Sequence, residues 1–335
     1  MPRQFCCVYE LGRFTAMGAL ALCLASSSLA IAQTASPVVS AKPAATEHFR
    51  SRISIYDLRT RSVHVIYTAD VLFEAPNWSS DGSYLLANSG GKLYRLELQP
   101  DGTARPHELA LDPKYVCNND KALAPNGKRL AFSAASGSST GSQVFVADAD
   151  GTHPRLLVAE TPSYFHGWSP DGATLAFVAK RDENFDLFRI AAEGGPQVRM
   201  TRDAGHNDGP DYSPDGRSIY INSDRSGTEQ IWRLDANGNE ASRAERITED
   251  GTQDWFPHPS PDGKWLVFLA FPREVEGHNA RLKVQLRMQP ILSSQGASRK
   301  SELLTTFFGG QGTINVNSWS PDSTRFAFVS YEPLP

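Results

Sequence analysis

A short turn motif, Ser-Pro-Asp-Gly or a close variant of it, recurs six times along the chain. Successive copies lie 45, 45, 44, 47 and 60 residues apart. A period near 45 residues is typical of the four-stranded blade of a β-propeller. The sequence therefore predicts an all-β fold, a six-bladed β-propeller. The Asp or Asn of each copy is Asp81, Asn126, Asp171, Asp215, Asp262 or Asp322.

The chemistry of the motif explains why it forms a turn. Proline presets φ for the second position of a tight turn, Asp or Asn tolerates the next position, and glycine accepts a positive φ. Each copy is followed by consecutive apolar residues, as in Leu175-Ala176-Phe177. A strand that is apolar on both sides is buried on both sides. We therefore expect this strand to be the second of its blade, packed between two neighbouring blades.

The two ends of the chain each supply half of a blade. The sixth motif is followed by one strand, 325–330, and the folded body begins with two strands at 53–58 and 63–67. The two N-terminal strands correspond to the third and fourth strands of a blade, and the first two strands of that blade are missing from this end of the chain. We expect the last blade to close by pairing of N-terminal with C-terminal strands, which removes exposed sheet edges. An open array with a degraded last repeat is the alternative.

The N-terminus has the layout of a secretory signal peptide. Arginines precede an apolar run at 16–24, and Ala30-Ile31-Ala32 offers a cleavage site. The run is shorter than the roughly 20 residues of a membrane span. We expect a signal peptide at 1–32, a flexible leader at 33–50 and the propeller at 51–335. The mature chain is expected to be periplasmic without a transmembrane segment, with secretion from the cell as an alternative.

The charge and cysteine content narrow the possible partners. The formal net charge is −4, and no basic cluster is present, so nucleic acid is not an expected partner. Only Cys117 remains after cleavage at residue 32, so an internal disulfide is not expected. We interpret Cys117 as a buried structural thiol.

The segments just before the turn motifs are rich in histidine, acids and carboxamides. In a propeller these segments lie around one mouth of the central channel, so we predict a polar ligand site there. A divalent metal is a further option, although no compact metal-binding spacing supports it and no other cofactor is expected. Alternatively, these side chains bond to nearby loop backbones. The candidate ligand-binding residues are Asn119, Asp120, His166, His206, Asn207, Asp208, Asp254, Trp255, His258, Gln311 and Asn315.

A long loop at 271–281 accounts for part of the 60-residue step. It contains Arg273, Glu274, Glu276 and His278. Extra length on the channel face favours a lid or a recognition element, and a tolerated surface insertion is the alternative.

The motif Trp-Ser-Pro-Asp-Gly, followed by an apolar strand, resembles the TolB-type propeller repeat over about residues 52–331. The strings at 206–212, 254–259 and 309–316 also resemble exported TolB-like proteins of unassigned function. The resemblance implies the fold specifically and the function weakly, because prolyl-oligopeptidase-like enzymes and oligogalacturonate lyases carry similar repeats. TolB has a further domain before its propeller, for which the short leader leaves no room. Its scaffold role in the Tol–Pal system is therefore not expected to transfer whole.

Two function classes follow. The first is a non-catalytic periplasmic binding or scaffold propeller that engages a protein or cell-envelope ligand at the channel mouth, with a small polar ligand as an option. The alternative is an enzyme on acidic saccharide fragments, which would perform lyase-like β-elimination at a rim His/Asp site, with a divalent metal as an option. Convergence of His166, His206 and His258 on one point would favour the enzyme, and separate networks would favour binding.

Overall fold

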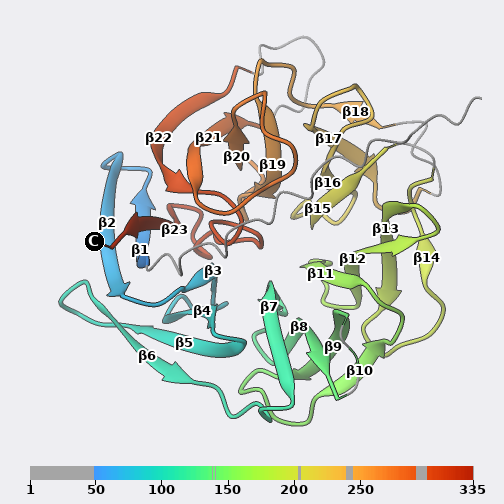
Figure 1. Ribbon diagram of the computed structural model, residues 1–335, viewed down its shortest axis with the longest axis horizontal. Coiled ribbons are helices and arrows are strands. Elements are labelled where there is room, and N and C mark those ends of the chain that lie inside the picture. The colour runs from blue at the N-terminus through green and yellow to red at the C-terminus, as the bar shows by residue number, and fades with distance from the viewer. Residues whose placement is uncertain are drawn as a thin grey trace, which may run out of the picture. The chain divides into compact units, whose positions relative to one another are not determined.

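The computed structural model describes residues 49–137, 139, 141–202, 205–238, 244–291 and 300–334. The expected signal peptide and almost all of the expected leader lie outside these residues. Every regular element in the described ranges is a β-strand, and the strands form six sheets around a central channel (Figure 1). The predicted six-bladed β-propeller is confirmed.

Five blades are four-stranded, and their strands follow one another in sequence from the channel outward. Blade one contains β3 (Glu74–Trp78), β4 (Tyr84–Ser89), β5 (Lys92–Leu98) and β6 (Ala104–Glu108). Blade two contains β7 (Tyr115–Leu123), β8 (Arg129–Ser136), β9 (Gln143–Asp148) and β10 (Arg155–Val158). Blade three contains β11 (Ser163–Trp168), β12 (Thr174–Arg181), β13 (Asn184–Ala191) and β14 (Val198–Arg199).

Blades four and five repeat the arrangement. Blade four contains β15 (Asn207–Tyr212), β16 (Ser218–Ser223), β17 (Gln230–Asp235) and β18 (Glu245–Arg246). Blade five contains β19 (Gln253–Pro259), β20 (Trp265–Phe271), β21 (Leu282–Pro290) and β22 (Glu302–Gly309).

Blade six joins the two ends of the folded body. It contains β23 (Arg325–Pro333), β1 (Phe49–Asp57) and β2 (Ser62–Ala69), in the order β2-β1-β23. The register of β1 against β23 runs from Phe49 opposite Pro333 to Asp57 opposite Arg325. Trp319 bridges to Phe326 where the other blades have their first strand. The predicted closure is confirmed and the open array is wrong, although β1 begins two residues before the expected boundary.

The turn motif is held by its own side chains. In blade three, Ser169 Oγ donates to Asp171 Oδ1 at 2.6 Å, Ala173 N donates to the same oxygen at 2.9 Å, and Gly172 has φ +67°. In blade two an asparagine takes the place of the aspartate, and Lys128 N donates to Asn126 Oδ1 at 3.0 Å. The turn therefore needs an oxygen acceptor at this position and not a charge.

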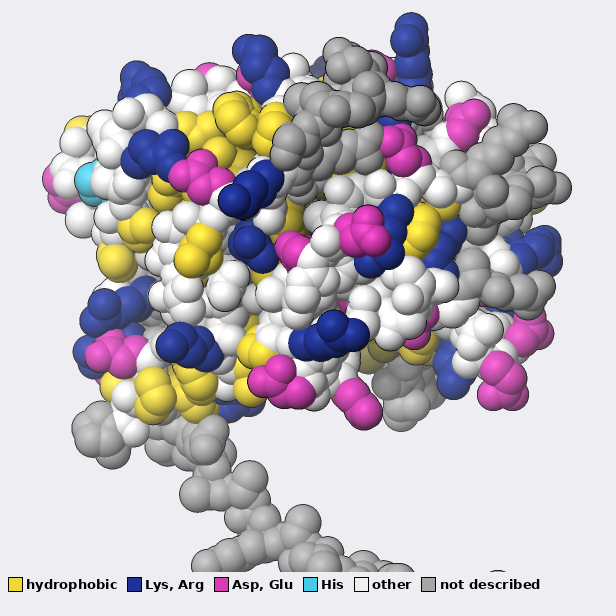
Figure 2. All heavy atoms as spheres, turned by 90° about the horizontal axis from the view of Figure 1, so that it is seen from above, with side chains coloured by type: hydrophobic (Ala, Val, Ile, Leu, Met, Phe, Trp, Pro, Cys, Tyr) yellow, Lys and Arg dark blue, Asp and Glu magenta, His cyan; other side chains and the backbone are white. Residues whose placement is uncertain are grey.

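The core lies between the blades, as the second-strand pattern predicts. Leu175, Ala176 and Phe177 of β12 are all 0% exposed. Cys117 is also buried, and burial raises the pKa of its thiol to about 12, which fits a structural role. Positive and negative side chains are interspersed on the face of the molecule shown in Figure 2.

The innermost strands of blades one to five each contain a β-bulge or another shift of register. A bulge changes which side chains face which way, so it re-aims residues that follow it. In β15 the shift lies between Asp208 and Asp211, and Gly209 has φ +57° there. A Cβ atom on Gly209 would lie 2.8 Å from Asn222 Oδ1. In β19 the corresponding shift holds Phe256 at φ +56°, a conformation that costs a bulky residue strain energy.

Candidate functional site

A segment of irregular backbone, residues 310–317, contacts the inner strands of blades three and five. His258 Nε2 lies 2.6 Å from the Ile314 carbonyl oxygen, and His166 Nδ1 lies 3.3 Å from that of Asn315. Two cavities occupy the channel, and His166 lines both. One, of about 370 Å³, lies at the end that carries the Ser-Pro-Asp-Gly turns.

The other cavity, of about 440 Å³, lies at the opposite mouth, where the inner strands begin. We call it the mouth cavity. Its walls combine acids, histidines, carboxamides and aromatic rings from blades two to five and from the 310–317 segment. They are Asn118, Asp120, Tyr164, His166, Val178, Phe185, His206, Asp208, Phe256, His278, Gln311 and Asn315.

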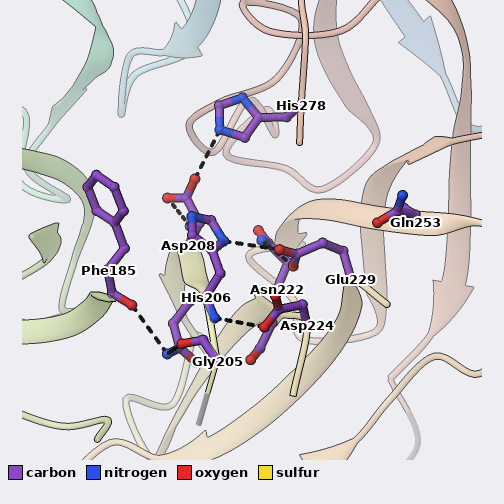
Figure 3. A network of polar contacts seen from close by, with 12 residues as sticks. Phe185, Gly205, His206, Asp208, Asn222, Asp224, Glu229, Gln253 and His278 are labelled. Atoms are coloured by element: carbon purple, nitrogen blue, oxygen red, sulfur yellow. Dashed lines mark hydrogen bonds and ion pairs between the residues drawn. The ribbon is translucent and has the colours of Figure 1, made fainter. Parts of the chain in front are cut away.

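Asp208 is the buried carboxylate at the centre of this wall. His166 Nε2 lies 3.1 Å from its Oδ1, and His278 Nε2 lies 3.4 Å from its Oδ2, as Figure 3 shows for His278. The Gly209 amide also donates to Oδ1 at 2.7 Å. Burial alone would raise the pKa of Asp208, but the two histidines outweigh it and hold the pKa well below its usual range.

The pKa values of the three histidines that line the mouth cavity are raised, whereas that of Asp208 is lowered. Burial would lower the pKa of His166, but Asp208 and Asp120 raise it to about 9. His206 Nδ1 lies 3.0 Å from Glu229 Oε1 (Figure 3), and Glu229 with Asp208 raises the pKa of His206 to about 9 against the effect of burial. Asp208 likewise raises the pKa of His278 against burial. The His166 and His206 rings are therefore cations at neutral pH.

Two oxygen acceptors of the cavity wall are left without donors. Asp120 is 5% exposed, and no residue in the described ranges donates a hydrogen bond to its carboxylate. Burial raises the pKa of Asp120 to about 6, with His166 opposing the rise. Gln311 Oε1 is also buried without a partner among the described residues. Buried acceptors are normally satisfied, so an unpaired one in a cavity indicates a place for a donor.

The long loop between β20 and β21 contributes His278 to this wall. The His278 ring centre lies 4.6 Å from that of Trp255 and 5.3 Å from that of Phe256. The loop therefore forms part of the cavity, as the lid-or-recognition interpretation expects. His278 was missed as a candidate site residue. The sequence feature that could have identified His278 is that it is the one histidine in the long loop, which was expected on the channel face.

Six of the eleven predicted site residues line the mouth cavity, namely Asp120, His166, His206, Asp208, Gln311 and Asn315. Two others stabilise the surrounding structure. Asn119 Oδ1 accepts a hydrogen bond from Asn88 Nδ2 at 3.2 Å, between blades one and two. The Asn207 amide donates to the carbonyl oxygens of Phe185 and Gly205 at 3.4 and 3.0 Å. The backbone interpretation holds for Asn207.

Three further predicted residues are buried beside the cavity and do not line it. Asp254 is 0% exposed and accepts a hydrogen bond from Thr252 Oγ1 at 2.8 Å. Trp255 is buried against His206 and His278. His258 contacts Asp211 Oδ2 at 2.9 Å and so faces the other end of the channel. The register shift between Trp255 and His258 aims the His258 side chain at Asp211 and away from the mouth.

The three histidines named for the lyase hypothesis therefore do not share one site. His166 and His206 line the mouth cavity, and His258 does not. No group of three or more His, Cys, Asp or Glu side chains in the described part of the chain is placed to hold a metal ion.

Comparison with known proteins adds the family. The model of the TolB β-propeller domain matches residues 121–303. The chain belongs to the TolB β-propeller family. This TolB-like chain is 43% identical over 287 residues to an uncharacterised protein of Agrobacterium fabrum, covering 85% of the chain and 94% of that relative.

A solved structure of a TolB candidate from Agrobacterium tumefaciens superposes with a TM-score of 0.79 at 43% identity. The superposition covers 85% of this chain and 99% of the chain in the solved structure. The Tol-Pal system protein TolB of Bordetella pertussis is 32% identical over 142 residues, 29% of this chain and 32% of that protein. In the described part of the TolB-like chain, no helix has the length and hydropathy that crossing a bilayer requires.

Proposed function

We propose that this TolB-like chain is a non-catalytic periplasmic binding propeller, and that its mouth cavity engages a protein or cell-envelope ligand. The observation that carries the proposal is a preformed cavity of about 440 Å³ in which acids, charged imidazoles and aromatic rings from four blades meet. A concave site that combines aromatic walls with a few placed polar groups is the usual form of a ligand pocket.

Contacts between different elements hold the wall together, which suits binding. Asp208 holds two histidines from different elements, and Asn222 Nδ2 donates to Glu229 Oε2 at 3.0 Å beneath His206. A site whose groups are already fixed loses little conformational entropy when a ligand binds. The side chains that line it supply hydrogen bonds, charge and ring surface, which are the means of recognition.

Export and the class of partner rest on two further observations. The N-terminal segment has the layout of a signal peptide, which supports the periplasm as the location and leaves secretion as the alternative. The match to a protein of the Tol-Pal system supports a protein or envelope component as the partner. The lyase alternative is less well supported, because its three histidines do not line one cavity. About one equivalent of bound Mn²⁺ in the purified protein would bring it back.

The test is an affinity capture from the envelope fraction of the native host, using the full chain with a C-terminal tag. Asp208→Asn and His278→Ala alter the cavity wall. Asp215→Asn is the matched control at the opposite end of the same blade, where Asn126 shows that the turn accepts asparagine. We expect the native chain and the control to retain a component that both cavity variants lose. Equal retention by all four proteins, each shown to be folded by thermal unfolding, would contradict the proposal.

A further inference from the structure

Asp120 is the acid of the mouth cavity that no histidine contacts directly. His166 and His278 contact Asp208, and His206 contacts Glu229, whereas the described residues place no donor on the Asp120 carboxylate. Ionisable groups from several elements face Asp120: Lys121 from its own strand, whose pKa burial lowers to about 7, Glu74 from β3, Tyr164 and His166 from β11, Asp208 from β15 and His278 from the long loop.

The one lysine next to this carboxylate is committed elsewhere. Lys121 is 0% exposed, and its Nζ donates to the Ala75 carbonyl oxygen at 2.5 Å and to Asn88 Oδ1 at 2.6 Å. It fixes the bulge of β3 to β7 and does not line the cavity. Asp120 is therefore available to a donor that comes from outside the protein.

The other residues of the cavity wall also favour a positively charged hydrogen-bond donor. Gln311 Oε1 is a second buried acceptor with no donor at hydrogen-bond distance among the described residues, although it interacts with the His278 ring and raises the pKa of that ring. Tyr164 and Phe185 line the same cavity and present partly exposed aromatic surface. Ring faces attract ammonium and guanidinium groups, most strongly where water is excluded. A charge-assisted hydrogen bond to a buried carboxylate is stronger than one between neutral groups.

We propose that the mouth cavity takes a basic side chain, a lysine ammonium or an arginine guanidinium, presented by a protein partner, with Asp120 and Gln311 Oε1 as its anchor. This inference rests on the proposed function, because it requires the mouth cavity to be the binding site. It specifies that the recognised group is positively charged and names the residues that bind this group.

The experiment titrates the full chain with three capped tripeptides, Gly-Arg-Gly, Gly-Gln-Gly and Gly-Glu-Gly. The imidazole resonances of isotope-labelled His206 and His278 report binding. The arginine peptide should shift both rings saturably and bind at least about tenfold more tightly than the glutamine peptide, because truncating one side of a buried charge pair weakens binding at least that much. The glutamate peptide should bind most weakly.

Variants and pH locate the anchor. Asp120→Asn should remove the preference for arginine, and Asp215→Asn should keep it. Arginine-peptide binding by the native chain should weaken as the pH falls through about 6, where Asp120 takes up its proton. Asp120→Asn should show a smaller pH effect over the same range. Thermal unfolding of each variant shows that it is folded.

Three results would overturn the inference: no saturable shift with any peptide, tighter binding of the glutamate peptide, or unchanged arginine binding by folded Asp120→Asn. Any of these leaves the proposed function standing if Asp208→Asn still loses the envelope component. If Asp208→Asn retains that component, the proposed function fails first, and the inference fails with it.

Discussion

His278 Nε2 lies 3.4 Å from Asp208 Oδ2, and this contact joins the long loop of blade five to the inner strand of blade four. The same carboxylate contacts His166 of blade three through its other oxygen. One buried acid thus links three elements that are distant in the sequence. The mouth cavity takes its form from this arrangement, so the protonation of these groups and the form of the cavity should change together.

Replacing Asp208 with asparagine should lower the pKa of both histidines that contact it. The carboxylate charge raises the pKa of His166 to about 9 against burial, so its removal should lower that value by at least about one unit. His206 should change less, because Glu229 remains its partner. Titration of the ring resonances by NMR measures this. A His166 pKa that stays near 9 in Asp208→Asn would show that another group sets it.

The stability of the protein should decrease between pH 6.5 and pH 9. A histidine whose folded pKa is raised stabilises the fold fully below its unfolded pKa, about 6.5, and loses that contribution as the pH rises through its folded pKa. His166 and His206 both have folded values of about 9. Lys121, whose pKa burial lowers to about 7, opposes this trend, and the two histidines outweigh it. We therefore expect a net loss of at least about 1 kcal/mol over this range by urea unfolding. His166→Asn should flatten the decrease, and a stability that is constant or rises with pH would contradict the assignment.

Asp254→Asn should stabilise the protein more at pH 8 than at pH 5. Asp254 is 0% exposed, its Oδ2 has no partner in the described ranges, and burial with the nearby Asp250 raises its pKa to about 7. A carboxyl group with a raised folded pKa favours the fold at low pH and disfavours it as the pH rises through 7. The stability difference from the native chain should grow by at least about 1 kcal/mol between these pH values. A difference independent of pH would mean that the carboxyl group does not titrate there.

The seam between β1 and β23 should contribute strongly to stability. Ile53 is 0% exposed in β1 and lies opposite Val329 of β23. Truncating it to alanine removes buried methyl groups and leaves a cavity, which costs about 2–5 kcal/mol. Val65→Ala in β2 is the control, because its side chain is 47% exposed and should cost less than about 0.5 kcal/mol. Similar small losses for both variants in denaturant unfolding would argue against a closed sixth blade.

The fold was predictable because its signals are local and repeated. Every turn contains an Asp or Asn, five of the six have a Ser two residues before it, and five have a Gly directly after it, so the turns can be recognised in the sequence. The closure followed from counting strands at the two ends. The strands at the seam differ from the expected bounds by a few residues: β1 and β2 span Phe49–Asp57 and Ser62–Ala69, and β23 extends to Pro333.

The site was predictable only in part, because bulges interrupt the alternation of side chains along the inner strands. His166 and Asp208 were found because they lie in the segments just before the turn motifs. His258 was misplaced because the register shift after Trp255 aims it at Asp211, and Phe256 faces the cavity instead. The sequence gives no mark of a bulge at Phe256, since a residue of this kind seldom adopts a positive φ. His278 reaches the site through a loop, whose path no periodicity predicts.

The most direct test of the mouth cavity as the ligand site is photo-crosslinking in cells of the native host. A photoreactive phenylalanine would replace Tyr164, a partly exposed ring in the cavity wall, or Ser80, an exposed residue at the other end of the channel. We predict a discrete crosslinked product from position 164 and none from position 80. A product from position 80 with none from position 164 would place the ligand at the wrong end of the channel and contradict the account.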